Sequence, residues 1–415
     1  MVSDKSFASV IRVNMALLRF SGVVPCEGDA KNVQRLRNLQ NVLSVVAYSC
    51  ILTYSVVYTL EFILYTVHLD TWMESFAMIL SIVGGQMRFT ILLLFRSRFH
   101  RLLNLSEELW LTLSASEQRC VRDRVRATRR LTYYYLFGCA FTIFFYAVAS
   151  LFIGQHSDSA NITVIRTLPY ACPFEVHRTP YYEIMYAMQL CSMTNVGLTC
   201  AAADTIGPVL VLTMSGHFKV LNSRIQRLCE SDPAVCKLQR TEKACQAGRG
   251  FLEVTNEEEG ALRSNRTVID LEACVRYHQT MFEFHREVGK LTGGIFLMQL
   301  IPSTYNISLV GFKLAGDDPD KFKYISQVAI AVIQLFLCNW PADVLRTESE
   351  AIAKASYFTS WYHFPYRLKR SLNIITIRSQ KPAQLSAYFI PLSLETFASM
   401  VSSAVSFFTM MRSIN

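Results

Sequence analysis

Seven apolar segments, each close to the length that a helix needs to cross a bilayer, constrain this chain more than any other feature. A membrane-spanning helix needs roughly 20 mainly apolar residues, because the hydrocarbon core of a bilayer is about 30 Å thick. The segments comprise residues 42–66, 72–95, 131–153, 182–212, 291–312, 324–340 and 394–411. Only 18% of the residues are charged, against about 25% in an average soluble protein. The sequence therefore predicts an all-α, polytopic membrane protein with seven transmembrane helices.

The distribution of Lys and Arg between these segments predicts the orientation of the chain. Alternate connections, beginning with residues 1–41, hold 34 Lys and Arg residues in total, whereas the other connections hold 6. Cytoplasmic loops carry an excess of these residues, so we expect the N-terminus in the cytoplasm and the C-terminus outside. The net charge of +9 follows from this asymmetry, and we expect no nucleic-acid partner. The first 25 residues lack the apolar core of a cleaved signal peptide, so the first segment is expected to be an uncleaved anchor.

This orientation divides the chain into six predicted parts. They are a cytoplasmic N-terminal segment (1–41), spans one to four (42–212), a cytoplasmic helical connection (213–290), spans five and six (291–340), a cytoplasmic helical anchor (341–393), and the last span with a short outer tail (394–415). Within the connection, residues 268–291 predict an amphipathic helix. Its apolar stripe comprises Leu271, Cys274, Val275, His278 and Phe282. We expect this stripe to pack against other cytoplasmic helices or subunits.

The sequence predicts neither an enzyme site nor a metal site. His278 and His285 share a helix face but lie about 10.5 Å apart along the axis, too far for one zinc ion with ligands near 2.1 Å. The twelve cysteines show no disulfide framework, so we expect mostly free thiols. No phosphate-binding loop or nucleophile elbow is present, so we expect no catalytic residues and no cofactor. Asn161 begins an N-glycosylation sequon in a predicted outer loop.

The last span carries a stripe of small hydroxyl-bearing residues along one helix face. The stripe comprises Ser399, Ser402, Ser403, Ser406, Thr409, Met410 and Ser413. Such a stripe in a membrane helix either lines water, as in a pore, or forms a close contact with another helix. The pattern alone favours the helix–helix contact.

The predicted outer halves of several spans are rich in aromatic and methionine side chains, which predict a binding pocket for a small uncharged ligand. The candidates are Trp72, Met73, Phe76, Phe145, Tyr146, Ala149, Tyr182, Met185, Tyr186, Gln189 and Gln327. The alternative is an interfacial aromatic belt with ordinary packing. Two charged residues, Arg88 and Asp204, fall within spans, where charges are usually paired or functional.

Three stretches of the chain carry a resemblance to the insect odorant receptor family. They are RTESEAIAKASYFTSWY (346–362), SQKPAQLSAYFIPLSLETFASMVSSAVSFFTMMRS (379–413) and LEACVRYHQTMFEFHREVGKL (271–291). The family resemblance implies a ligand-gated, non-selective cation channel that assembles as a tetramer in the plasma membrane of an olfactory neuron dendrite. It also implies that Pro391 breaks the seventh segment, that the hydroxyl stripe lines a central pore, and that Met410 and Ile414 form its gate.

The connection between spans four and five is shorter here than in the shared co-receptor of that family, and the C-terminal tail differs. The chain thus resembles a ligand-specific tuning subunit, which would form a heterotetramer with the co-receptor in the lipid membrane. Its ligand would be a small volatile molecule, with aromatic compounds as candidates. The alternatives are a G-protein-coupled chemoreceptor and, less favoured, a transporter.

Overall fold

The described part of the chain folds into long helices and one short hairpin. The computed structural model describes residues 6–24, 33–65, 69–152, 168, 179–230, 257–314, 321–359 and 361–414. The elements are α1 (Phe7–Val10), α2 (Arg12–Phe20), α3 (Val33–Tyr65), α4 (Leu69–Leu94), α5 (Arg96–Leu111), α6 (Ala115–Phe152), α7 (Tyr181–Glu230), α9 (Glu257–Leu314), α10 (Lys321–Tyr357), η3 (Trp361–His363), α11 (Tyr366–Ser379), β1 (Ser386–Ala387), β2 (Ile390–Pro391) and α12 (Leu394–Ile414). The predicted all-α class is confirmed.

Five helices in the described part of the chain are long and apolar enough to cross a membrane. The spans comprise Gln34–Leu64, Ser75–Leu94, Ala115–Val148, Tyr181–Leu228 and Tyr324–Tyr357. The other two apolar segments, 291–312 and 394–411, are helical parts of α9 and α12 but are not among these five. The chain is a multi-pass membrane protein, and the count of seven crossings and their orientation stay predictions.

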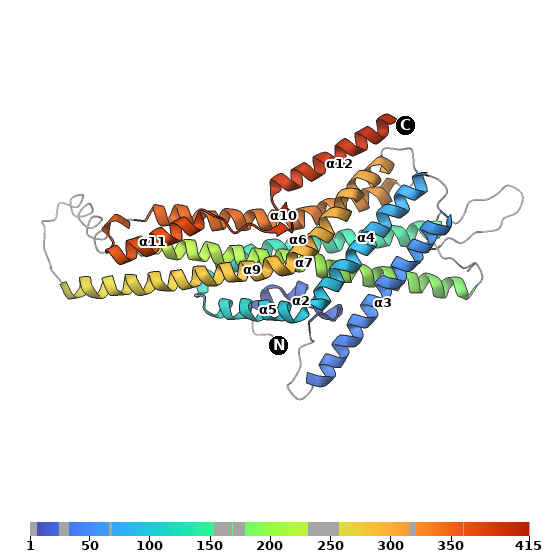
Figure 1. The fold of residues 1–415 in the computed structure, drawn as a ribbon. Coiled ribbons are helices and arrows are strands. Elements are labelled where there is room, and N and C mark those ends of the chain that lie inside the picture. Colours follow the sequence, from blue (N-terminus) through green and yellow to red (C-terminus); the bar gives the residue numbers. More distant parts are fainter. Residues whose placement is uncertain are drawn as a thin grey trace, which may run out of the picture.

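The long helices extend well beyond the thickness of a bilayer. α7 has 50 residues and α9 has 58, so α7 alone is about 75 Å long at 1.5 Å per residue. Figure 1 shows α7, α9 and α10 continuing side by side to the end of the molecule where α11 lies. The predicted borders after residues 212, 290 and 340 therefore lie inside continuous helices, and the described parts of the connections that were predicted to be cytoplasmic are prolongations of the apolar segments.

α7 is the central helix of the bundle. Its residues 201–218 are all buried, and it packs against α6, α9 and α10. Gly216 allows a close approach of α6, because a Cβ at this position would lie 3.0 Å from the Cα of Val121 on α6. The absence of a side chain at Gly216 therefore sets the spacing between α6 and α7.

Polar contacts join the extended ends of α6, α7 and α9. Arg224 of α7 donates from Nε to Glu117 at 2.7 Å and from its terminal nitrogen to the other carboxylate oxygen at 3.0 Å. The same guanidinium lies 4.8 Å from the ring of Tyr277 on α9, and the Tyr277 hydroxyl is 2.6 Å from Nδ1 of His217. This network fixes the relative register of the three helices.

The amphipathic helix predicted over residues 268–291 is confirmed as part of α9. Leu271, Cys274 and His278 are buried, and Val275 and Phe282 are half-buried. The stripe therefore faces the interior of the helical anchor, as its periodicity predicts. Burial and the positive charge of Arg378 lower the pKa of His278 to about 4.

The break before α12 differs from the prediction, which assigned it to Pro391. α11 already ends at Ser379, twelve residues earlier, so the proline does not end a helix. Instead β1 and β2 form an antiparallel hairpin that pairs Ser386 with Pro391. Ser393 then caps the start of α12, since its Oγ accepts a hydrogen bond from the backbone N–H of Thr396 at 3.1 Å. The hairpin lets α12 leave the bundle in a new direction (Figure 1).

Candidate functional site

A cavity of about 210 Å³ lies among the membrane helices α3, α4, α6, α7, α9 and α10. Its walls are mainly apolar, and each helix contributes. Apolar lining residues include Tyr54, Ile82, Ile143, Met193, Val196 and Ile330. Such a cavity is smaller than the ~300–1,000 Å³ typical of sites for drug-sized ligands. The space suits a small, mostly uncharged molecule.

Polar groups enter this cavity at two levels. At one level, Gln327 of α10 donates from Nε2 to the hydroxyl of Tyr146 on α6 at 2.6 Å. At the other, Asn306 of α9 donates to Oγ of Ser81 on α4 at 2.5 Å. Each pair joins two helices across the cavity, so a ligand that hydrogen-bonds to either pair changes a contact between helices.

A buried ion pair lies next to the cavity. Arg88 of α4 and Asp204 of α7 are 2.9 Å apart and are only 4% and 0% exposed. Asp204 also accepts hydrogen bonds from the Tyr135 hydroxyl at 2.6 Å and from Nε2 of Gln334 at 2.9 Å. Arg88 and Gln334 both line the cavity. The sequence predicted that Arg88 and Asp204 are either paired or functional; the structure pairs them with each other, and the pair connects four helices to the cavity wall.

Two of the eleven predicted pocket residues line this cavity, namely Tyr146 and Gln327. Trp72 and Phe76 stack on each other with ring centroids 5.2 Å apart, nearer the start of α4. Phe145 packs its ring 4.6 Å from that of Phe141. These three side chains form aromatic clusters away from the described cavity, and a role in ligand binding stays a prediction for them.

The predicted residues on α7 also lie nearer its start than the cavity does. The Tyr186 hydroxyl donates to the backbone carbonyl of Ala147 at 3.0 Å, which ties α7 to α6. Tyr182 and Gln189 are buried and Met185 is half-buried. The side chains of Met73 and Ala149 lie outside the described residues, as does Asn161. Ligand contact stays a prediction for the α7 residues, as does glycosylation for Asn161.

The cavity begins about two helical turns further along the spans than the predicted cluster. Met193 lies eight residues after Met185, and Met78 and Ile82 follow Trp72 and Phe76 on α4. The sequence did contain a signal, because the polar residues Ser81, Asn306 and Gln334 occur within apolar segments. Polar side chains at such depth must find partners, and here they gather at one site.

The hydroxyl stripe of α12 faces away from its own subunit. Ser399, Ser402, Ser403, Ser406, Thr409 and Ser413 are all exposed, and Met410 is 52% exposed. On the opposite face Ala404 is buried and the Phe397 ring packs 5.8 Å from that of Phe336 on α10. The Ile414 side chain lies outside the described residues. This arrangement leaves the stripe available either to water or to another subunit, so the roles of pore and gate stay predictions.

The His, Cys, Asp and Glu side chains of the described residues are the candidate ligands for a metal ion. No group of three or more His, Cys, Asp or Glu side chains gathers among them. Cys50, Cys120, Cys139, Cys191, Cys200, Cys274 and Cys338 are free thiols. The described thiols agree with the prediction of mostly free cysteines.

Comparison with known proteins places this architecture in a family. The family model described as 7tm Odorant receptor matches residues 68–405. Odorant receptor 9a of Drosophila melanogaster is 29% identical over 140 residues, which cover 33% of this chain and 36% of that protein. Odorant receptor 13a of the same species is 25% identical over 341 residues, covering 76% of this chain and 74% of that one.

A solved structure shares the fold over the whole chain. The insect olfactory receptor OR5 from Machilis hrabei, in complex with eugenol, has a TM-score of 0.74 at 14% identity, with 100% of both chains covered. At this identity the likeness concerns the fold alone. The family model, however, spans well over half of the sequence. The protein therefore belongs to the insect odorant receptor family, whose members are multi-pass membrane receptors and not enzymes.

Proposed function

We propose that this chain is the odorant-binding subunit of a heteromeric, ligand-gated, non-selective cation channel in the plasma membrane of an olfactory neuron. Its ligand is a small volatile molecule, and its partner is the odorant co-receptor of the family. The cavity among the membrane helices is the observation that carries the proposal. The relative that shares the fold holds eugenol, a small aromatic volatile, and a ligand of that class suits the apolar walls of this cavity.

Helix α10 provides a direct mechanical connection from the cavity to the pore helix. It presents Gln327 and Gln334 to the cavity, and one to two turns later it reaches the start of α12. There the backbone N–H of Ser393 donates to Oδ1 of Asn339 at 3.2 Å, next to the Phe336–Phe397 ring contact. A ligand that shifts α10 by changing its cavity contacts therefore moves the anchor of α12.

The exposed face of α12 supports the assignment of a pore. Hydroxyl groups along one helix face are suited to lining a water-filled pore. Here that face is exposed and does not pack against the described residues of its own subunit. Met410 and Ile414 near the end of the helix form an apolar ring once several subunits assemble, and such a ring closes a pore by dewetting. The co-receptor supplies the remaining subunits.

The test is a cavity substitution in cells that express this chain together with the co-receptor. Tyr146→Phe removes the hydroxyl that accepts from Gln327, so the cavity presents an unsatisfied amide to the ligand. A lost hydrogen bond of about 0.5–1.5 kcal/mol shifts the half-maximal odorant concentration by about 2- to 13-fold. Whole-cell current across an odorant panel measures the shift. Phe144→Leu, an exposed position on the same helix, is the matched control, and equal effects of both substitutions would refute the placement.

Two other classes of protein, a G-protein-coupled chemoreceptor and a transporter, would give different experimental results. A G-protein-coupled chemoreceptor has its N-terminus outside, so an epitope at residue 1 would be labelled in unpermeabilised cells. A transporter gives slow, saturable flux without unitary currents. Single-channel openings in excised patches, without added nucleotide, would exclude both alternatives.

A further inference from the structure

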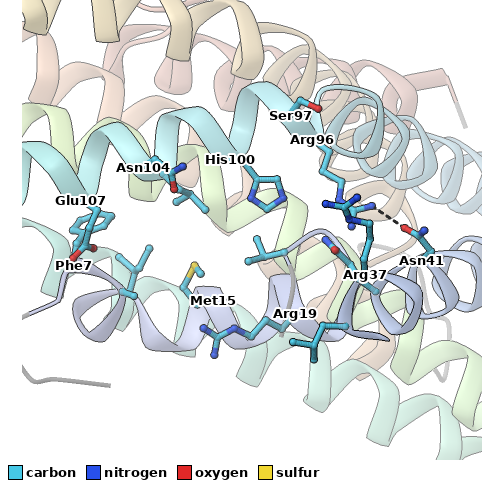
Figure 2. A pocket seen from close by; sticks show the side chains of 16 residues that line it. Phe7, Met15, Arg19, Arg37, Asn41, Arg96, Ser97, His100, Asn104 and Glu107 are labelled. Carbon is cyan, nitrogen blue, oxygen red and sulfur yellow. Dashed lines mark hydrogen bonds between the residues drawn. The ribbon is translucent and has the colours of Figure 1, made fainter. Parts of the chain in front are cut away.

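A second and larger cavity, of about 860 Å³, lies outside the transmembrane cavity, where α1 and α2 meet α3 and α5. Figure 2 shows its lining, with Arg19 on α2, Arg37 at the start of α3, and Arg96 and His100 on α5. Arg96 follows the membrane segment Ser75–Leu94 by two residues, and Arg37 lies at the beginning of the segment Gln34–Leu64. The cavity therefore sits at the membrane surface, on the side that the Lys and Arg distribution assigns to the cytoplasm.

Positive charge in this cavity is concentrated at one end. Arg37 and Arg96 extend toward the same region, and Glu107, the acidic residue in the lining, lies at the opposite end (Figure 2). Arg96 donates to the neutral amide oxygen of Asn41 at 3.3 Å. Neither Arg37 nor Arg96 takes part in an ion pair of the described residues.

The two guanidinium groups also disfavour each other. Burial and the positive charge of Arg37 lower the pKa of Arg96, which is the effect of a like charge nearby. Glu107 is engaged elsewhere, since its carboxylate accepts from Oγ of Ser6 at 3.5 Å. The basic end of the cavity therefore has room and charge for an anion.

The surface next to the basic end is apolar and exposed. Val42, Val45 and Val46 follow Arg37 on α3 and are 58%, 64% and 49% exposed. The floor of the cavity is apolar as well, with Ile11, Met15 and Leu103. A molecule with a charged headgroup and hydrocarbon chains can contact both the basic end of the cavity and the neighbouring apolar face of α3. A soluble anion would contact only the basic end.

We propose that this cavity binds the phosphorylated headgroup of an anionic lipid of the cytoplasmic leaflet, with the acyl chains lying along the exposed face of α3. Arginine forks suit phosphate oxygens because they donate two parallel hydrogen bonds. Two arginines at one end of the cavity suit a phosphorylated headgroup, such as that of a phosphoinositide. A bound lipid joins the N-terminal helices to α3 and α5 and so holds the N-terminal segment against the bundle.

The test compares two double substitutions in the purified full-length receptor. Arg37→Gln with Arg96→Gln removes two charges from the cavity. Arg35→Gln with Arg101→Gln removes two charges from exposed positions on the same two helices that do not line it. Binding of water-soluble dioctanoyl phosphatidylinositol bisphosphate is measured by microscale thermophoresis. Each basic residue near anionic lipid contributes about 1 kcal/mol, so the cavity pair should weaken binding about tenfold or more, while the surface pair leaves it within about twofold.

Further binding measurements distinguish a lipid from a soluble phosphate compound as the ligand. Inositol trisphosphate carries the headgroup without chains and should bind at least about tenfold more weakly than the dioctanoyl lipid, and dioctanoyl phosphatidylcholine should not compete. Arg37→Gln alone alters an exposed side chain, so it preserves the fold and keeps the test valid if the double variant unfolds. Absence of binding to the unmodified receptor, equal weakening by both double substitutions, or equal affinity for inositol trisphosphate would each overturn the proposal.

Discussion

At the scale of single residues, the ion pair between Arg88 and Asp204 carries a large desolvation cost that the bundle must offset. Two opposite charges 2.9 Å apart are removed from water inside the membrane helices, and only good geometry with extra hydrogen bonds offsets their desolvation. The Tyr135 hydroxyl and the Gln334 amide supply those bonds. The sequence predicted that both charges are paired or functional, but it could not show that each was the partner of the other, because 116 positions separate them.

Removing one member of this pair should be far more harmful than removing both charges. Asp204→Asn leaves the Arg88 charge buried, at a cost of about 3–5 kcal/mol, so the melting temperature in detergent and the surface expression should fall sharply. Combining Arg88→Gln with Asp204→Asn should recover much of the loss. Asp123→Asn, an exposed carboxylate, is the control. A double variant as unstable as the single one would contradict this account of the pair.

The buried His278 predicts a pH dependence of stability. Because its pKa falls to about 4 in the folded protein from about 6.5 in an unfolded chain, the folded state binds fewer protons between these values. The contribution of His278 to the free energy of unfolding is fully present above about pH 6.5. It declines as the pH falls toward 4, by up to about 1.4 kcal/mol per pH unit. Thermal unfolding at pH 7, 6 and 5 should show a smaller decline in His278→Gln than in the unmodified protein, and identical slopes would exclude His278 as the cause.

At the scale of helices and loops, the sequence predicted the type of element better than its ends. The stripe from Leu271 to Phe282 was correct because burial follows the helical period. The borders after residues 212 and 290 lie within continuous helices, since a helix that leaves the bilayer exchanges lipid for other helices without a local signal. The sequence did not predict the hairpin before α12, because distant contacts hold it: the backbone N–H groups of Ala383 and Ser393 donate to side chains 34 and 54 positions away.

The contact of α6 with α7 can be tested with two glycines. Gly216→Ala places a methyl group 3.0 Å from the Cα of Val121, a backbone atom that cannot move aside alone. Overpacking of this kind costs about 1–3 kcal/mol, against a gain of roughly 0.8–1 kcal/mol in helix propensity. Gly311→Ala has the same gain with nothing within 4 Å. The melting temperature should therefore fall, or stay level, for Gly216→Ala and rise for Gly311→Ala; an equal rise in both would refute a tight contact.

At the scale of the whole molecule, one chain leaves large apolar side chains unburied. Tyr388 and Phe389 at the tip of the hairpin are 71% and 80% exposed, and Phe358 is 81% exposed. All three lie within residues 341–393, the predicted helical anchor, and outside the five membrane segments. Clusters of this kind mark interfaces with other proteins. Together with the exposed face of α12, they agree with the proposed assembly around a shared axis.

Cysteine accessibility distinguishes a pore from a helix contact on α12. Ser403→Cys, on the exposed stripe, should react with a charged, water-soluble thiol reagent during odorant application, so that the current declines. Ala404→Cys, at a position 1% exposed, should not react. The current through channels formed with the co-receptor is the measurement. Protection of both positions would favour a subunit contact over a water-filled pore.

Different residues shape the cavity and hold the helices together, and this has an evolutionary consequence. The apolar wall residues Tyr54, Ile143 and Met193 take no part in the Arg88–Asp204 pair or in the Gly216 contact, which hold the helices together. Substitutions in the walls therefore change which molecules fit while the framework persists. A gene family built on this framework can diversify its chemical range by exchanging a few wall residues, without evolving a new channel each time.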